Sequence, residues 1–310
     1  MAESTTDPPV WFITGCSTGF GWEFVRAALA HGFRVVATAR DPKRLDDLVI
    51  GHEERAKVLA LDVTKPDQIK HAVSEAERAF GRIDVLVNNA GYGYLAAVEE
   101  GEEKDIHAIF ETNFFGVVAM IQAVLPGMRA RRHGYIVNIA SVGGVVGYAG
   151  SGYYAATKIA VEGLSESLTQ EVEPLGIHVL IIEPGPFRTN FGRSVKQSSN
   201  VIADYENSAG KHRRETIERS GKQAGDPARA AEAVIKALQS PTPPRHLVLG
   251  HAGFDNVENQ WRSLLHEADL WKATSLGADY PAAGRTCANI DLSLTKIKAV
   301  FLRLLLFDTR

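Results

Sequence analysis

The alternation of short apolar runs with helical segments constrains the fold of this 310-residue chain more than any other feature. Seven runs rich in valine, isoleucine and leucine are expected to be strands: 10–14, 34–39, 57–63, 84–89, 134–141, 178–185 and 245–250. The segments between them are expected to include helices over about 20–31, 66–80, 104–131 and 227–239. Apolar strands that alternate with helices form a parallel sheet covered on both faces. We therefore expect an α/β fold: one doubly wound parallel sheet of about seven strands, with helices on both faces.

Such a sheet also predicts where a ligand binds, because ligands occupy the carboxyl edge near the point where strand order reverses. Residues 186–225 follow the sixth expected strand, are polar and weakly patterned, and are expected to form a substrate lid over that edge. We expect one domain over residues 8–250. Residues 251–310 are expected to form a C-terminal extension that packs on the domain or on another subunit.

The composition argues against several classes of protein. A net charge of −3 lacks the excess of positive charge that is typical of nucleic-acid-binding proteins. Cys16 and Cys287 are too few for a disulfide framework, and the ten histidines lack zinc-ligand spacing, so we expect no catalytic metal. No apolar run approaches the ~20 residues of a membrane span, and no apolar signal segment is visible. We therefore expect a cytoplasmic protein.

A glycine-rich loop, TGCSTGFG at 14–21, joins the first expected strand to the first expected helix. Gly15, Gly19 and Gly21 allow a tight turn and a close approach of the backbone to a ligand. The helix N-terminus behind them offers N–H groups to a pyrophosphate. The spacing differs from the common G-x-G-x-x-G pattern, and a glycine loop alone can be a simple turn. Its place between a strand and a helix favours a dinucleotide site in a Rossmann-type fold.

The end of the second expected strand indicates which dinucleotide binds. An acidic residue there suits the ribose 2′-hydroxyl of NAD, whereas an arginine suits the 2′-phosphate of NADP. Asp41 precedes Pro42 and is explained as a helix N-cap, which leaves Arg40 without another role. We therefore favour NADP(H), and the alternative is that Arg40 is simply a solvated arginine at a strand end.

Two adjacent tyrosines and a lysine suggest chemistry in the segment GYYAATK, 152–158. On a helix, positions i and i+4 share a face, so Tyr154 pairs with Lys158 and Tyr153 pairs with Thr157. An ammonium at 4–5 Å attracts a phenolate by roughly 4 kcal/mol at an effective dielectric near 20. We expect this to bring the pKa of Tyr154 from about 10 to near 7, where it can exchange a proton. The alternative is a surface pair without a role.

Taken in order, these motifs resemble the short-chain dehydrogenase/reductase family, in the branch with a TGxxxGxG loop, over about residues 8–250. The resemblance also rests on Asp62 in LDVT, NNAG at 88–91, Asn113 in TNFFG, Ser141 in NIAS and PGPFRT at 184–189. It implies a catalytic tetrad of Asn113, Ser141, Tyr154 and Lys158. It implies cofactor contacts by Gly15, Ser17, Thr18, Gly19, Phe20, Gly21, Arg40, Asp62, Val63, Asn89, Ala90, Gly91, Tyr154, Lys158, Pro184, Gly185, Phe187 and Thr189.

The family mechanism assigns a role to each member of the tetrad. Hydride would pass from the nicotinamide to a carbonyl carbon while Tyr154 protonates the oxygen and Ser141 polarises it. Lys158 would bind the nicotinamide ribose and lower the pKa of Tyr154, and Asn113 would order a water that passes protons onward. Phe187 departs from the family pattern, which usually has a smaller aliphatic residue there.

The run WFITGCSTGFG looks most like the branch with retinol- and 17β-hydroxysteroid-type dehydrogenases, which implies a ketone or secondary alcohol on a bulky apolar skeleton. Side chains that could line such a pocket, or simply pack there, are Tyr92, Tyr94, Val142, Tyr148 and Phe187. The expected activity is that of an NADPH-dependent carbonyl reductase, reversible as an alcohol dehydrogenase. The alternatives are a 3-oxoacyl thioester reductase and a non-catalytic NADP(H)-binding sensor.

Two further expectations concern assembly. Family members usually pair through the helix at 104–131 and the Tyr154 helix, so we expect a homodimer or homotetramer. Ile159 and Gly163 belong to an apolar run suited to that interface, although core packing would explain it as well. The tail at 293–307 is apolar at helical spacing and carries basic residues. We expect it to pack on protein; the alternatives are a membrane interface and disorder.

Overall fold

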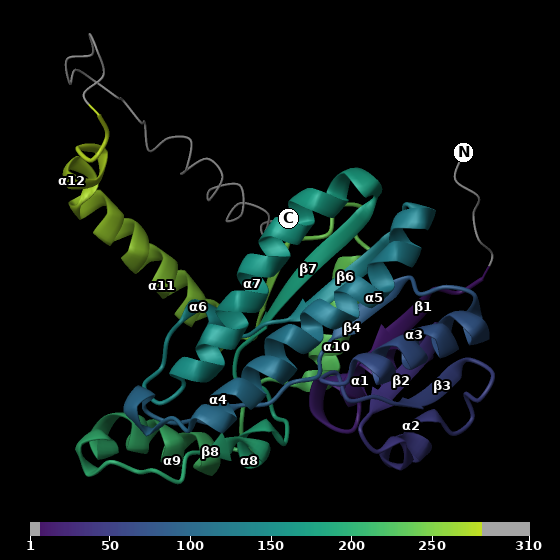
Figure 1. Cartoon of the computed structure of the whole chain (residues 1–310), viewed down its shortest axis with the longest axis horizontal. Coiled ribbons are helices and arrows are strands. Elements are labelled where there is room, and N and C mark those ends of the chain that lie inside the picture. Colours follow the sequence, from purple (N-terminus) through teal and green to yellow (C-terminus); the bar gives the residue numbers. More distant parts are fainter. Residues whose placement is uncertain (1–6, 281–310) are drawn as a thin grey trace, which may run out of the picture. The chain divides into compact units, whose positions relative to one another are not determined.

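The computed structural model describes residues 7–280, and its centre is a seven-stranded, wholly parallel sheet (Figure 1). The strand order is β3-β2-β1-β4-β6-β7-β9. The central strand β1 places Trp11 beside Val35 of β2 and Val85 of β4. The strand bounds are β1 Val10–Ile13, β2 Arg34–Ala39, β3 Ala56–Ala60, β4 Val85–Asn88, β6 Gly134–Ile139, β7 Ile177–Pro184 and β9 His246–Leu249. All seven predicted strands are confirmed, with ends that shift by up to three residues.

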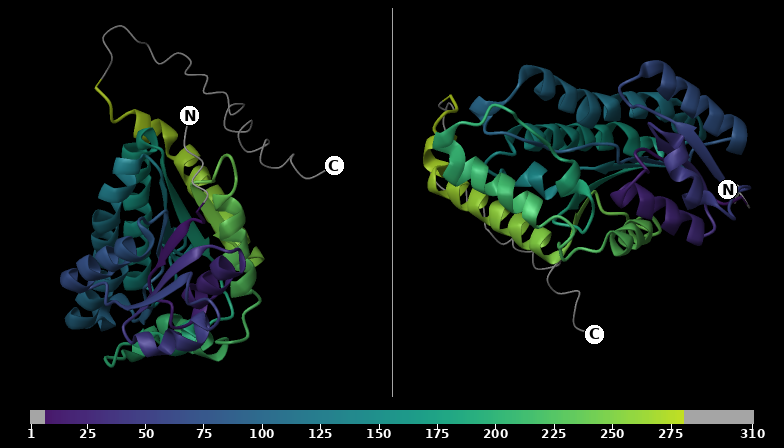
Figure 2. Two further views of the ribbon diagram at one scale, coloured as in Figure 1. Left: turned by 90° about the vertical axis from the view of Figure 1, so that its right-hand side faces the viewer. Right: turned by 90° about the horizontal axis from the view of Figure 1, so that it is seen from below.

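Helices cover both faces of the sheet, as predicted for a doubly wound fold (Figures 1 and 2). On one face lie α3 Pro66–Phe80, α5 Gly116–Arg131 and α7 Gly152–Val172; on the other lie α1 Gly19–Ala30 and α10 Pro227–Leu238. Successive side chains of a strand point to opposite faces. Trp11 therefore belongs to the core beneath α1 and α10, while Phe12 belongs to the core beneath α5 and α7.

The helix predicted over 104–131 consists of three segments: α4 Glu103–Phe110, a π-helical turn Glu111–Phe115, and α5. The stretch Glu103–Arg131 contains an 18-residue window with a mean hydropathy of 1.6 and is long enough to cross a membrane. The expectation that no apolar run approaches this length was therefore wrong. The stretch packs against the sheet through Val117, Met120 and Val124. The packing of this stretch against the sheet accounts for its apolar composition.

The segment after β2 is shorter and tighter than a full helix. A 3₁₀ turn, η1 Pro42–Leu45, leads into α2 Asp46–Val49. The Asp41 carboxylate accepts a hydrogen bond from the Lys43 N–H at 3.2 Å, so the predicted N-cap is confirmed.

Residues 186–225 form a compact layer beside the cleft edge of the sheet. They contain α8 Phe191–Ser194, β8 Lys196–Gln197, η5 Ala203–Tyr205, a π-helical turn Glu206–Gly210 and α9 Lys211–Glu218. Strand β8 pairs in parallel with β5 Tyr94–Leu95. Neither strand was predicted, because a two-residue strand carries no periodic pattern.

The remaining elements are short, except at the C-terminal end. They are η2 Val98–Glu100, α6 Val142–Val145, η4 Glu173–Leu175, α11 His251–Leu270 and α12 Lys272–Leu276. The chain divides into two compact units, Met1–Trp261 and Arg262–Arg310. In the first unit α11 buries Gly253 and Val257. The packing predicted for 251–310 stays a prediction, and the tail at 293–307 lies outside the described residues.

Candidate active site

The strand order reverses between β1 and β4, and a cleft opens at the carboxyl edge of the sheet there. Segments that follow β1, β2, β3, β4, β6 and β7 line it, together with the lid. Its volume is ≈1390 Å³, whereas pockets for one small ligand usually measure about 300–1,000 Å³. The cleft therefore has room for a dinucleotide and a second molecule. Of the site residues predicted from the sequence, all line this cleft except Gly21 and Asn113.

The glycine loop is held in a conformation that requires glycine. Gly15 has φ +72°, and a Cβ on it would lie 2.8 Å from the Ala90 Cα. A Cβ on Gly21 would lie 2.4 Å from the Gly15 carbonyl oxygen, so this position requires glycine. Gly21 lies behind the residues that line the cleft. The loop leads into the N-terminus of α1, which Thr18 leaves without a side-chain cap. This N-terminus lines the cleft and suits a pyrophosphate.

Asn89 fixes that loop to the sheet. Its amide donates to the Thr14 carbonyl at 2.8 Å and to the Gly15 carbonyl at 3.0 Å. The Thr14 hydroxyl in turn accepts hydrogen bonds from the backbone N–H groups of Asn89 and Ala90, each at 3.0 Å. The first part of the NNAG segment therefore shapes the glycine loop.

Cys16, the unusual residue of the loop, is structural. It is fully buried, and its thiol donates to the Ile13 carbonyl at 3.2 Å. Burial raises the pKa of the thiol to about 12, although a hydrogen bond with the Thr38 backbone opposes this. Because the thiolate is the reactive form, Cys16 is not a nucleophile.

Basic side chains gather at the end of the cleft formed by β2 and β3. Arg40 lines the cleft and is exposed, and among residues 7–280 no carboxylate pairs with it. Arg44 and Lys65 also line this end, and neither was singled out from the sequence. Asp62 also lines the cleft and accepts two hydrogen bonds from Thr64, at 3.0 and 2.8 Å. One Asp62 oxygen is thus committed to shaping the turn after β3.

The segment after β7 forms the opposite end of the cleft. Pro184, Gly185, Phe187 and Thr189 all line it. The Phe187 ring lies 5.1 Å from the ring of Phe20 and is 9% exposed. The unusual phenylalanine therefore completes the apolar core beneath this wall.

The helix register predicted from spacing is confirmed for the two tyrosines. Tyr154 and Lys158 both line the cleft, and the Lys158 Nζ lies 5.8 Å from the centre of the Tyr154 ring. Tyr153 points elsewhere: its hydroxyl donates to the Val98 carbonyl at 2.6 Å, and its ring stacks on Tyr94.

Ser141 stands opposite this pair as the N-cap of α6. Its hydroxyl oxygen accepts a hydrogen bond from the Gly143 N–H at 2.9 Å. A hydroxyl that accepts there still has its own O–H to donate. A hydrogen bond with Ser141 also lowers the pKa of Tyr154. The hydroxyl groups of Ser141 and Tyr154 thus lie close together in the cleft.

The expected lowering of the Tyr154 pKa by Lys158 was wrong for this structure. Burial raises the pKa of the phenol, and the hydrogen bond from Ser141 only partly opposes it. Lys158 is 7% exposed, and its ammonium donates to the Ile139 carbonyl at 2.7 Å. Burial lowers the pKa of Lys158 to about 8, against the opposing charge of Glu162. Tyr154 is therefore held in its protonated form, ready to donate.

Asn113 lies in the π-helical turn between α4 and α5, behind the cleft wall. Its amide nitrogen donates to the Tyr92 carbonyl at 2.9 Å and to the Thr157 hydroxyl at 3.2 Å. Its oxygen accepts from the Tyr92 N–H at 3.0 Å. The side chain thus holds the loop after β4, and its predicted role in ordering a water stays a prediction.

The predicted pocket residues Tyr92, Tyr94, Val142, Tyr148 and Phe187 all line the cleft. The residues that the structure adds near Tyr154 and Tyr148 include Phe191, His212 and Asn256. The Phe191 ring lies 5.6 Å from the ring of Tyr154, and Asn256 donates to the Tyr148 hydroxyl at 3.1 Å. His212 stacks on Tyr148, and burial lowers its pKa. These three residues belong to none of the motifs recognised in the sequence, so no sequence pattern indicated that they line the cleft.

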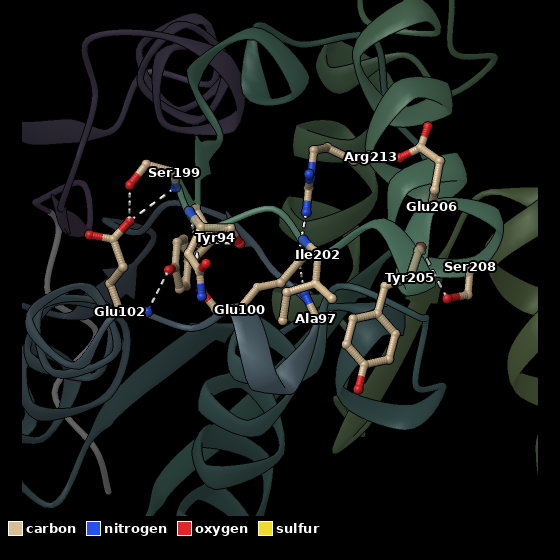
Figure 3. Close-up of polar contacts among 12 residues, drawn as sticks. Tyr94, Ala97, Glu100, Glu102, Ser199, Ile202, Tyr205, Glu206, Ser208 and Arg213 are labelled. Atoms are coloured by element: carbon tan, nitrogen blue, oxygen red, sulfur yellow. Dashed lines mark hydrogen bonds and ion pairs between the residues drawn. The ribbon is translucent and has the colours of Figure 1, made fainter.

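The lid is fastened to the loop after β5 by a buried carboxylate (Figure 3). Glu100 is 1% exposed and accepts hydrogen bonds from the N–H groups of Ala97, at 2.9 Å, and Ile202, at 3.0 Å. Arg213 of α9 pairs with the same carboxylate at 2.5 Å. Nearby, Glu102 accepts two hydrogen bonds from Ser199. These polar contacts therefore hold residues 186–225 against the loop after β5.

Comparisons with known proteins agree with this arrangement. The family model for short chain dehydrogenases matches residues 9–200. The chain belongs to the short-chain dehydrogenase/reductase family. It is thus an oxidoreductase that uses NAD(P).

Individual relatives span most of the chain. Oxidoreductase BOA17 of Botryotinia fuckeliana is 38% identical over 270 residues, 87% of this chain and 98% of that protein. The 3-ketodihydrosphingosine reductase of Bacteroides thetaiotaomicron is 37% identical over 245 residues, 78% of this chain and 88% of that protein. The crystal structure of a short-chain dehydrogenase from Streptomyces avermitilis is 41% identical with a TM-score of 0.82, and covers 87% of this chain and 100% of that one.

Two other solved structures hold different cofactors. A serine dehydrogenase complexed with NADP+ is 30% identical, with a TM-score of 0.68 and coverage of 77% of this chain and 94% of that one. A 3-ketoacyl-(acyl-carrier-protein) reductase from Brucella melitensis complexed with NADH is 26% identical, with a TM-score of 0.66 and coverage of 79% and 98%.

Proposed function

We propose that this protein is an NADPH-dependent carbonyl reductase, reversible as a secondary-alcohol dehydrogenase, that acts on a ketone with a bulky apolar skeleton. The observation that carries the proposal is the convergence of Ser141 and Tyr154 on one point of a cleft that also holds Lys158. A carbonyl oxygen at that point receives two hydrogen bonds, which stabilise the charge that develops on it.

The cofactor, when bound, supplies the hydride. The protein supplies the proton, because burial keeps the Tyr154 phenol protonated. Proton donation by a positioned acid contributes about 10²–10⁴-fold to a rate. Lys158 places a positive charge beside the phenolate that remains, which lowers the cost of proton loss. Ser141 holds the substrate oxygen.

The preference for NADP(H) is supported by the charges at the end of β2. Arg40 has no carboxylate partner among the described residues, and Arg44 stands at the same end of the cleft. A guanidinium suits a phosphate because it donates two parallel hydrogen bonds. Solved relatives hold either NADP+ or NADH, so the assignment depends on these residues of the chain.

An apolar substrate is supported by the walls near Tyr154. Tyr92, Tyr94, Tyr148 and Phe191 provide aromatic surface there. Similarity to a 3-ketodihydrosphingosine reductase favours a ketone with a long apolar portion over a small one.

A 3-oxoacyl thioester carried on an acidic protein is less well supported. Such a carrier needs a basic docking surface at the mouth of the cleft. Two of the cations there already have partners, since Lys196 pairs with Asp105 and Arg219 pairs with Glu215. The third reading, a non-catalytic sensor, would have no need of a complete Ser141, Tyr154 and Lys158 set.

Replacing each tyrosine in turn tests the proposal. Tyr154→Phe is expected to abolish ketone reduction and leave the NADPH affinity within a few-fold, because the phenolic proton is used only in chemistry. Tyr153→Phe is the matched control and should have a mild effect, since its hydroxyl bonds the Val98 carbonyl away from the cleft. Wild-type protein that binds NADPH but reduces no member of a ketone panel would favour the sensor.

The family often forms oligomers, and we propose a homodimer or homotetramer built through α5 and α7. Phe115, which directly precedes α5, is 51% exposed and Ile159 of α7 is 55% exposed, so apolar surface remains uncovered on these elements. Gly163 is exposed, and a Cβ there would meet no other atom within 4 Å, which permits close approach of a partner helix. Sedimentation at micromolar concentration that shows only monomer would refute this.

A further inference from the structure

A row of charged side chains runs from Lys158 along α7 and into the edge of the sheet. Lys158, Glu162 and Glu166 are spaced by four residues, so they lie one above another on one face of the helix. Glu183 of β7 and His246 of β9 complete the row. These five groups are the charged residues that act on Glu162 and on His246.

His246 joins two carboxylates. Its Nδ1 lies 2.5 Å from the Glu183 Oε1, and its Nε2 makes a short contact with the Glu166 Oε1. Both ring nitrogens face acceptors, so both carry protons and the ring is an imidazolium. The hydrogen bond with Glu183 is the main cause that raises the pKa of His246 to about 9, although burial opposes it.

Glu183 is wholly buried, and Glu162 lies near it. Burial, followed by the charge of Glu183, raises the pKa of Glu162 to about 7. The Glu162 Oε1 and the Glu183 Oε2 are buried and have no hydrogen-bond partner among residues 7–280. Two close carboxylates share protons readily, because both cannot be ionised without mutual repulsion. These two oxygens therefore make no hydrogen bond to each other or to another described group, and each is free to accept a proton.

Glu162, next to Lys158 in the row, lies close to α6, the short helix that Ser141 caps. A Cβ on Gly144 would lie 2.3 Å from the Glu162 Oε1, so a glycine at this place lets the carboxylate approach α6, which Ser141 caps. Glu162 also acts on the charge of Lys158. The amide of Asn113, by contrast, is committed to Tyr92 and Thr157. Glu162 therefore shares a face of α7 with Lys158 and acts on it through its charge, independently of that amide.

We infer that Glu162, Glu183, His246 and Glu166 form a proton relay that connects Lys158 with solvent at Glu166, whose side chain is 44% exposed. The inference rests on the proposed reductase function. Each reduction transfers one hydride from NADPH to the carbonyl carbon and one proton from Tyr154 to the oxygen. The proton is replaced through Lys158, which regains it from Glu162. Glu162 regains it from Glu183, Glu183 from His246, and His246 from solvent beside Glu166. Only O–H and N–H bonds form and break, and one solvent proton is consumed.

The four residues are positioning residues, since they act through Lys158. Glu162→Gln keeps the shape of the side chain but cannot exchange a proton. We expect it to lower kcat for ketone reduction by about tenfold to a hundredfold, a part of the usual contribution of acid–base groups. NADPH affinity should stay within about twofold, as expected for a loss confined to the chemical step. The pH profile of kcat should lose its inflection near 7, and the solvent isotope effect should increase.

Glu171→Gln is the matched control, because Glu171 is an exposed carboxylate of the same helix whose one hydrogen bond within residues 7–280 is with Ser167, at 3.3 Å. It should leave rate and profile unchanged. His246→Ala should also slow reduction, and added imidazole should restore the rate in proportion to its concentration. A purely structural role for His246 would not respond to imidazole. Melting curves of each variant identify any that fails to fold.

A measurement without turnover separates this inference from the proposed function. In the protein with NADP+, a rapid jump to alkaline pH should produce the ultraviolet phenolate band of Tyr154, identified by its loss in Tyr154→Phe. Its appearance should be slower in Glu162→Gln than in wild type or Glu171→Gln. This result supports the relay even if no ketone is reduced. Equal rates in all three proteins, with the same pH profile of kcat where turnover occurs, would overturn it.

Discussion

Replacing Glu100 with glutamine is expected to loosen the lid without unfolding the sheet. The carboxylate joins the loop after β5 to two points of the lid, the Ile202 N–H and the Arg213 guanidinium (Figure 3). It also accepts from the Ala97 N–H within its own turn. Burial would raise its pKa, but these two N–H groups and Arg213 together lower it, so the group is ionised at neutral pH.

The expected cost follows from the acceptors that a glutamine lacks. An amide has one carbonyl oxygen, so one of the two backbone N–H groups would face an NH2 group, and Arg213 would lose its counter-ion. Hydrogen bonds to a charged group contribute about 1.5–3 kcal/mol each. Removing one partner of a buried ion pair costs about 3–5 kcal/mol. Both estimates give about 3–5 kcal/mol, which corresponds to a factor of about 10²–10⁴ in the equilibrium between closed and open lid.

Limited proteolysis with trypsin measures this equilibrium, because α9 contains Lys211, Arg213 and Arg214. The variant should be cleaved within the lid about 10²-fold faster than wild type or more, at a protease concentration where opening is a rapid pre-equilibrium. Glu99→Gln is the control: Glu99 is exposed and accepts one hydrogen bond from the Tyr205 hydroxyl, at 2.7 Å. Exposed contacts of this kind contribute under about 1 kcal/mol.

Two results would refute the reasoning. Equal lid cleavage in Glu100→Gln and Glu99→Gln would mean that the buried pair does not hold the lid. A cooperative loss of the whole fold, without prior cleavage in the lid, would mean that Glu100 stabilises the domain globally.

Three other predictions concern the cofactor end and the edge of the sheet. Arg40→Ala should weaken NADPH binding by about 1.5–3 kcal/mol and NADH binding little, measured by fluorescence titration; equal losses would remove the case for NADP. Gly21→Ala places a Cβ 2.4 Å from a backbone oxygen of the glycine loop, so it should lower Tm and impair binding of both cofactors. Gly163→Ala, where the Cβ meets nothing within 4 Å, should do neither in the monomer. The pKa of His246 rises from 6.5 to about 9 on folding. Its charged form therefore stabilises the fold fully below pH 6.5, and the contribution is lost as the pH rises through about 9. His246→Gln should flatten that part of the Tm profile.

The sequence determined the sheet and the main-chain part of the site because both depend on local regularities. Short continuous apolar runs identify the strands of a sheet that is covered on both faces, and apolar residues at a spacing of 3.6 identify the helices. Four-residue spacing on a helix is enough to put Tyr154, and not Tyr153, beside Lys158. The proline after Asp41 likewise identified an N-cap that the structure confirms.

Tertiary structure decided what depends on distant neighbours. The pKa of Tyr154 moves opposite to the expected direction, because burial by surrounding elements outweighs a lysine at 5.8 Å whose ammonium is bonded to Ile139. The amide of Asn113 serves the loop after β4. The row from Lys158 to Glu166 depends on Glu183 and His246, which only the pairing of β7 with β9 brings to α7. Spacing along one helix is a property of the chain, whereas burial and charge pairing across elements exist only once the sheet and its helices have packed.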